Sequence, residues 1–104
     1  MSRDHKDVTI LHHVAGQGGK YVAQIEGDSR HAMLEWEPAD GPAGEVRIAT
    51  HTIVPEDWRG RGIASLLVDR MVADARRDGF RIVPRCSYVA AKFAEHPEWE
   101  ELRG

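Results

Sequence analysis

The period of the hydrophobic residues changes near the middle of the chain, and this change constrains the fold more than any other feature. Residues 45–54 alternate apolar and polar side chains, which is the pattern of a half-buried strand. From residue 64 the apolar side chains instead recur at the spacing of one helix face, at Leu67, Val68, Met71, Val72 and Ala75. Gly79 then predicts a left-handed helix cap, and residues 80–83 predict another strand. Because strand–helix–strand connections are right-handed crossovers, we expect the two strands to be parallel neighbours or near neighbours.

The first third of the chain predicts an antiparallel meander, because short period-two segments alternate with glycine-containing turns at residues 16–19 and 27–28. The predicted strands are residues 8–13, 21–25 and 31–36. Residues 38–44 are rich in Pro and Gly and are predicted to form a loop. Residues 1–7 alternate charges, so we expect a flexible start.

A second, shorter helix is predicted after the crossover, with Ser87 as its N-cap and Pro97 at its end. Trp99 and Leu102 are expected to dock a final turn on the core. The polar residues of the long helix are assigned to its solvent face: Ser65, Asp69, Arg70, Asp74 and Arg77. Together these patterns predict an α/β fold with a mixed, mainly antiparallel sheet of about five strands and a βαβ crossover.

The length and composition fit a single globular domain that spans residues 1–104. The chain is 41% hydrophobic and 30% charged, and it lacks the run of about 18 apolar residues that a membrane span needs. Its start also lacks the apolar core of a secretory signal, so we expect a cytoplasmic location and no membrane partner. A net charge of -3 argues against a nucleic-acid partner. The sequence is compatible with a monomer and with a homodimer.

Cys86 is the single cysteine, which excludes an intrachain disulfide and a thiolate cluster for a metal. The adjacent His12 and His13 point to opposite sides of a predicted strand, so their spacing does not suit a metal ion. No metal site is therefore predicted. If Cys86 has a chemical role, it acts as a thiol.

The segment between the alternating strand and the long helix is rich in Gly and Arg. A helix N-terminus offers free backbone N–H groups and a partial positive charge, and arginines bind phosphate oxygens. Residues 59–65 are therefore predicted to bind an anion. In the alternative reading, the glycines only turn the chain and the arginines are solvated. The segment lacks the ending of a Walker loop and meets the dinucleotide fingerprint only in part, so a pyrophosphate ligand of another type fits better.

Arg59-x-x-Gly62-x-Ala64 resembles the Arg/Gln-x-x-Gly-x-Gly/Ala signature of the general N-acetyltransferase (GNAT) superfamily, whose loop and helix N-terminus hold the pyrophosphate of acetyl-coenzyme A. Residues 51–55, 83–89 and 96–98 add to the likeness, which extends in order from about Tyr21 to Leu102. Together they resemble a small, single-domain GNAT-like subfamily with an active-site cysteine segment. The resemblance implies a truncated GNAT-like fold and an acetyl-coenzyme A-dependent N-acetyltransferase that acts on an amine.

The resemblance also implies roles for individual residues. The backbone residues that would bind the pantetheine arm are Thr52, Ile53 and Val54. The residues that would bind the pyrophosphate are Arg59, Gly60, Arg61, Gly62, Ile63, Ala64 and Ser65. In this superfamily the two parallel strands splay apart to admit the thioester, which would place His51 and Cys86 on the two walls of the gap, near the acyl carbon.

His51 is then the expected base, Cys86 the expected nucleophile or thiol donor, and Tyr88 the expected proton donor to the departing thiolate. From the residues alone, each has a plainer alternative. Cys86 would be a small buried apolar residue, His51 a strand histidine bound to a carbonyl, and Tyr88 a packing residue.

The acceptor side departs from the superfamily pattern. Larger GNAT enzymes place two helices between their first two strands, whereas Val14 and Tyr21 are separated by six residues here. The acceptor is therefore expected to be large, such as a protein, or a partner subunit completes the site. Trp36, Trp58 and Trp99 are candidates for an exposed surface of this kind, with core packing as the alternative. The competing hypothesis is a non-catalytic module that binds coenzyme A or acyl-coenzyme A and regulates a partner.

Overall fold

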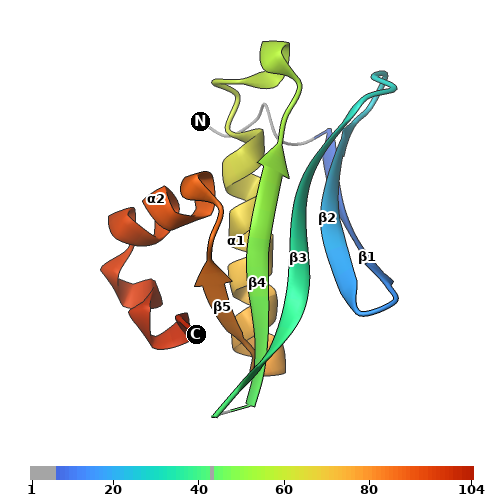
Figure 1. Ribbon diagram of the computed structural model, residues 1–104. Coiled ribbons are helices and arrows are strands. Elements are labelled where there is room, and N and C mark those ends of the chain that lie inside the picture. Colours follow the sequence, from blue (N-terminus) through green and yellow to red (C-terminus); the bar gives the residue numbers. More distant parts are fainter. Residues whose placement is uncertain (1–6, 43) are drawn as a thin grey trace.

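The computed structural model describes residues 7–42 and 44–104 and arranges them around a five-stranded sheet with the order β1-β2-β3-β4-β5. The antiparallel strands are β1 (Val8–Ala15), β2 (Gly18–Ile25), β3 (His31–Gly41) and β4 (Gly44–Ile53). Helix α1 (Ile63–Asp78) then leads to β5 (Arg81–Pro84), which lies parallel to β4 (Figure 1). The predicted α/β fold, meander and parallel crossover are confirmed. The predicted flexible start falls outside the described residues, apart from Asp7.

The two glycine-containing turns differ from their predicted lengths in opposite directions. The first turn is confined to residues 16–17, and Gly19 belongs to β2. A Cβ atom on Gly19 would lie 2.7 Å from the carbonyl oxygen of His13 and 2.7 Å from the Trp36 ring. Gly19 therefore serves close packing between strands. The second turn is longer than the predicted two residues, since β2 ends at Ile25 and β3 begins at His31.

The predicted loop at residues 38–44 is wrong, because β3 runs to Gly41 and β4 begins at Gly44. Pro38 pairs with Arg47 across the β3–β4 ladder, and the pairing of β3 with β2 extends only as far as Trp36. At Pro38 the strand therefore has a neighbour on one side, the position in which a strand tolerates a proline. Cross-strand pairing overrides the local loop preference here.

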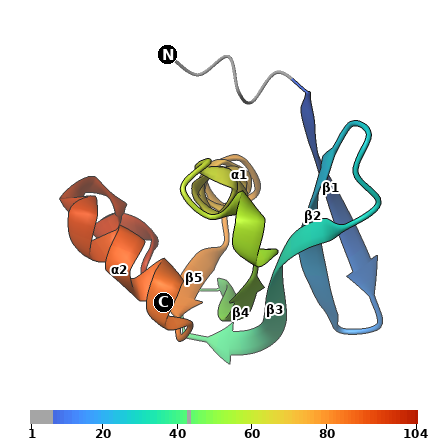
Figure 2. The same cartoon turned by 90° about the horizontal axis from the view of Figure 1, so that it is seen from above.

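Helix α1 packs on one face of the sheet, which curves around it (Figure 2). Gly79 caps the helix in the predicted left-handed conformation, with its N–H bound to the carbonyl of Ala75. The buried side chains between α1 and the strands form the core, and they include Tyr21, Leu34, Leu67, Met71 and Ile82. Trp36, Trp58 and Trp99 are also buried in the core, so they do not form an exposed surface for an acceptor.

Asp74 departs from its predicted position on the solvent face, since it is 1% exposed. The hydroxyl of Tyr21 donates a hydrogen bond of 2.9 Å to its Oδ2 atom. Nitrogens of Arg70 and Arg77 lie 3.2 Å from its Oδ1 atom. A buried carboxylate needs such hydrogen-bond partners. Tyr21 lies fifty-three positions away in the sequence, so the hydrophobic period of the helix gives no sign that it contacts Asp74.

Helix α2 (Ser87–Glu95) and the 3-10 helix η3 (Pro97–Leu102) lie beyond the β5 edge of the sheet (Figures 1 and 2). Cys86 is the N-cap of α2, so the predicted cap at Ser87 is wrong by one residue. Trp99 and Leu102 are buried, as predicted. Among the described residues, no helix is long and apolar enough to cross a membrane.

Candidate functional site

A loop with two left-handed glycines connects β4 to the N-terminus of α1. The chain leaves β4 at Ile53, passes through the 3-10 helix η2 (Glu56–Trp58) and enters α1 at Ile63. Gly60 and Gly62 have φ angles of 84° and 79°, a region that disfavours residues with a Cβ. Gly62 is the N-cap of α1, where the first backbone N–H groups have no acceptor within the helix. This helix end therefore offers backbone donors and a positive dipole to an anion.

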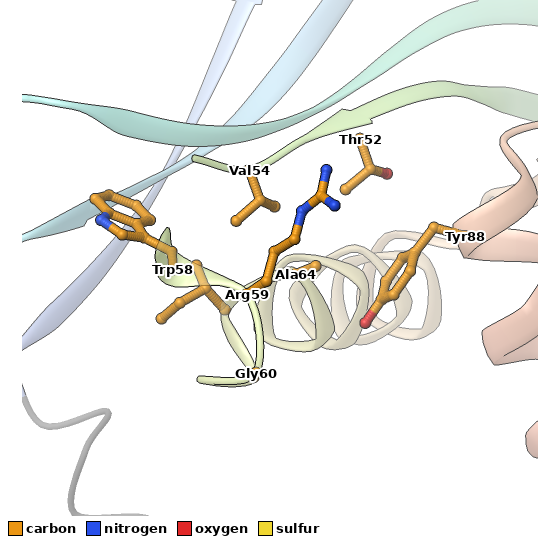
Figure 3. Close-up of a pocket in the computed structure, with 9 residues that line it drawn as sticks. Thr52, Val54, Trp58, Arg59, Gly60, Ala64 and Tyr88 are labelled. Carbon is orange, nitrogen blue, oxygen red and sulfur yellow. The ribbon is translucent and has the colours of Figure 1, made fainter. Parts of the chain in front are cut away.

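A pocket of about 580 Å³ lies beside this helix end and reaches the first turn of α2 (Figure 3). Its volume is within the usual range for small-molecule sites. The lining residues are Thr52, Val54, Trp58, Arg59, Gly60, Gly62, Ile63, Ala64 and Tyr88. Most of the predicted cofactor residues therefore share one concave surface. Arg61 and Ser65 lie outside this lining, and the Ile53 side chain is 54% exposed.

The pairing between β4 and β5 ends before β4 does. Ala49 pairs with Pro84, and the N–H of Cys86 donates to the carbonyl of Ala49 at 2.9 Å. From there the chain turns into α2, while β4 continues to Ile53. The last residues of β4 consequently present a strand edge toward the pocket. Such an edge can bind an extended ligand through backbone groups.

Cys86 lies at the junction of β5 and α2, and its Sγ atom is 3.3 Å from Oγ1 of Thr52. Burial raises the pKa of the thiol, but the Thr52 hydroxyl and the backbone N–H groups of Val89 and Tyr88 outweigh it. The net pKa of Cys86 is lower than that of an ordinary thiol. This environment favours the thiolate, the reactive form of cysteine.

The His51 side chain lies on the face of β4 that points away from Cys86 and the pocket. Adjacent strand residues point to opposite faces, and its neighbour Thr52 faces Cys86. The Nδ1 atom of His51 is 3.5 Å from Oε1 of Glu35, its register partner on β3. The His51 side chain is 70% exposed. His51 and Cys86 thus come from the two parallel strands, but the His51 side chain lies on the face of β4 opposite to the Thr52 side chain that contacts Cys86.

A family model described as GCN5-related N-acetyl-transferase matches residues 20–102. The match covers the pocket, the strand edge and both helices. The chain belongs to this family. Members of the GCN5-related N-acetyltransferase family transfer an acetyl group, and the family generally uses acetyl-coenzyme A as the donor.

Two side chains of this acetyltransferase have contacts at the site that were not predicted from the sequence. Thr52 was predicted to bind only through its backbone, whereas its hydroxyl contacts the Cys86 thiol. Glu35 was not predicted as a site residue, yet it lies beside His51. The contact between Thr52 and Cys86 could have been anticipated from the period-two alternation of β4. This alternation places the side chains of His51 and Thr52 on opposite faces of the strand. Among the described residues, no group of three or more His, Cys, Asp or Glu side chains could hold a metal ion.

Proposed function

We propose that this chain transfers an acetyl group from acetyl-coenzyme A to an amine and binds the cofactor in the pocket between β4, α1 and α2. The observation that carries the proposal is the continuity of the pocket lining from the loop at Gly60 and Gly62 to Tyr88 on α2. One end offers helix N–H groups for the pyrophosphate, and the other lies near Cys86. The pyrophosphate and the acetyl thioester lie at opposite ends of the pantetheine arm in acetyl-coenzyme A, so the two ends of the pocket match the two ends of this part of the cofactor.

The residues present suit such a ligand. Gly60 has open space where a Cβ atom would be, so a phosphate group can approach its backbone closely. Figure 3 shows the Arg59 side chain extending into the pocket, where its guanidinium can bind phosphate oxygens. Thr52 and Val54 supply the strand edge for the pantetheine arm. Acetyl-coenzyme A, when bound, supplies an acetyl group activated as a thioester.

Two routes are open to the residues at the acyl end. In the direct route, His51 accepts the proton of the acceptor amine, with Glu35 orienting its ring through Nδ1. In the covalent route, the Cys86 thiolate takes the acetyl group as a new thioester, and the amine then removes it. Tyr88 donates a proton to the departing thiolate in either route.

The face of β4 that carries His51 determines the side from which the acceptor approaches. Because His51 and Glu35 lie on the sheet face away from the Thr52 side chain, an amine served by His51 approaches from that outer face. β1 and β2 are joined by a turn at residues 16–17 rather than by helices. We therefore propose an amine presented by a larger molecule, or a site completed by a second subunit.

Calorimetric titration with acetyl-coenzyme A tests the cofactor site. We expect binding by the wild type and its loss in the double variant Arg59→Ala/Gly62→Glu, which removes a phosphate ligand and fills the loop with a carboxylate. Undiminished affinity in the double variant would overturn the site assignment. Turnover is tested by mixing the protein with acetyl-coenzyme A and each of a panel of amines, and by measuring whether the free thiol of coenzyme A is released steadily. Tight binding with no turnover across the panel would favour the non-catalytic module.

Cys86→Ala separates the two routes. The direct route predicts that this variant keeps its activity and that the wild type gives no acetyl adduct by mass spectrometry. The covalent route predicts an adduct on wild-type Cys86 and loss of both adduct and activity in the variant.

A further inference from the structure

We propose that Arg30 is a positioning residue for residues 54–62, the loop between β4 and α1 that we call the cofactor loop. Arg30 holds this loop in its binding geometry before the ligand arrives. Arg30 precedes β3 and bridges Asp28, on the same β2–β3 loop, to Asp57 in η2. The inference rests on the proposed cofactor site, because it assigns the function of a contact beside that site. Arg30 and Asp57 are 27 positions apart in the sequence, so the tertiary fold creates the contact.

The guanidinium of Arg30 binds both carboxylates at once. Its Nη1 and Nη2 atoms donate to Oδ1 and Oδ2 of Asp57 at 2.6 and 3.0 Å. Its Nε and Nη2 atoms donate to Oδ1 and Oδ2 of Asp28 at 3.0 and 2.8 Å. These bonds lower the pKa of both aspartates, which keeps the carboxylates charged at neutral pH. Paired bonds of this kind fix orientation as well as distance.

Trp58 connects the bridge to the pocket. Its indole N–H donates to Oδ2 of Asp28 at 3.2 Å, and the guanidinium of Arg30 lies 5.7 Å from the centroid of its ring. The Trp58 side chain is 1% exposed and lines the pocket just before Arg59 and Gly60. The β2–β3 loop therefore fixes one end of the cofactor loop, while α1 fixes the other.

The loop needs this support because its glycines give it conformational freedom. A binding loop that is disordered before binding must be ordered by the ligand, and the ordering reduces affinity. Exposed ion pairs contribute little to global stability, because solvent screens them. Arg30 is therefore expected to affect local order and cofactor affinity more than the melting temperature.

Arg30→Met tests the proposal, with Arg103→Met as the matched control. The Nε and Nη2 atoms of Arg103 likewise donate to Oε1 and Oε2 of one carboxylate, that of Glu100, at 3.0 and 2.8 Å. The Arg103 guanidinium lies 5.5 Å from the centroid of the Phe93 ring. Arg103 belongs to the C-terminal segment after η3 and does not line the pocket among the described residues. A second variant, Asp57→Asn, removes the charge at the other end of the bridge with little change in shape.

We expect hydrogen exchange of the ligand-free protein at residues 58–62 to quicken about tenfold in Arg30→Met and Asp57→Asn. The dissociation constant of coenzyme A should rise about tenfold, which corresponds to about 1.4 kcal/mol, with little change in kcat. Arg30→Lys keeps one charged donor and should give an intermediate value for both. The control Arg103→Met should match the wild type at residues 58–62 and in affinity.

Unchanged exchange at residues 58–62 in both test variants would overturn the proposal, and so would faster exchange with unchanged affinity. If the wild type itself does not bind coenzyme A, the proposed function fails. The exchange experiment, which needs no ligand, still decides whether Arg30 orders the loop.

Discussion

The thiol of Cys86 contacts the hydroxyl of Thr52, with 3.3 Å between Sγ and Oγ1, whereas His51 faces the other side of the same strand. The junction of β5 and α2 places the thiol there, since the Cys86 N–H is held by the carbonyl of Ala49. The chemical partner of the cysteine is consequently a hydroxyl group and a helix N-terminus. His51 has Glu35 beside it instead.

Thr52→Val should make Cys86 less reactive near neutral pH. The hydroxyl helps to lower the pKa of the thiol, so its removal raises that pKa and leaves less thiolate. Loss of one hydrogen bond of about 1 kcal/mol corresponds to a decrease of roughly fivefold in thiolate at neutral pH. The rate of alkylation by iodoacetamide as a function of pH measures the shift. Thr50→Val is the control, since the Thr50 hydroxyl donates to the carbonyl of Glu35 instead; an unchanged rate profile in Thr52→Val would contradict the assignment.

Gly60→Ala and Gly79→Ala should have similar effects on stability and different effects on binding. Both glycines have left-handed φ angles, 84° and 83°, and open space where a Cβ atom would be. Each substitution should therefore lower the free energy of unfolding by about 1–2 kcal/mol. Gly60 lines the pocket and Gly79 caps the far end of α1, so coenzyme A affinity should fall only in Gly60→Ala. Urea unfolding and calorimetry measure the two effects, and equal affinities would argue against close approach of the ligand to Gly60.

Stability should fall as the pH decreases below about 6.5, partly because of His12. Burial lowers the pKa of His12 below the unfolded value of 6.5, so the unfolded chain binds more protons in the window just below that value. The His12 Nε2 atom accepts a hydrogen bond of 3.1 Å from the indole N–H of Trp36, and protonation removes this acceptor. Its ring also stacks on Tyr21.

Urea unfolding at pH 7.5 and pH 5.5 measures the contribution. His12→Phe can keep the ring stack but cannot be protonated, so its free energy of unfolding should depend less on pH than that of the wild type. An equal dependence in both proteins would exclude His12 as the cause.

Tyr21→Phe should destabilise the fold by about 1–2 kcal/mol, because it removes the hydroxyl donor from the buried Oδ2 atom of Asp74. Arg70 and Arg77 remain near the other carboxylate oxygen, so the protein should still fold. Asp78→Asn, which alters an exposed carboxylate on the same helix, should change the free energy of unfolding by less than about 0.5 kcal/mol. Chemical denaturation compares the two variants, and equal effects would contradict the importance of the buried bond.

Local sequence patterns predicted most of the fold, because the spacing of hydrophobic residues indicates strands and helices, and Gly and Pro residues indicate where these elements end. The change of hydrophobic period between residues 54 and 64 identified β4 and α1, and Gly79 marked the end of the helix. The same local cues failed at Pro38, where pairing with β4 continues the strand, and at Asp74, which is satisfied by Tyr21. In both cases the deciding partner is distant in the sequence.

The sequence by itself determined the order of strands and helices along the chain, the left-handed cap at Gly79 and the family to which the chain belongs. These properties depend on periodicity, backbone freedom and a short motif, all of which are local. The tertiary structure decided which side chains meet: Thr52 with Cys86, Glu35 with His51, and Arg30 with Asp57. Strand register and the packing of loops fix these pairs, and neither can be read from the residues on one segment alone.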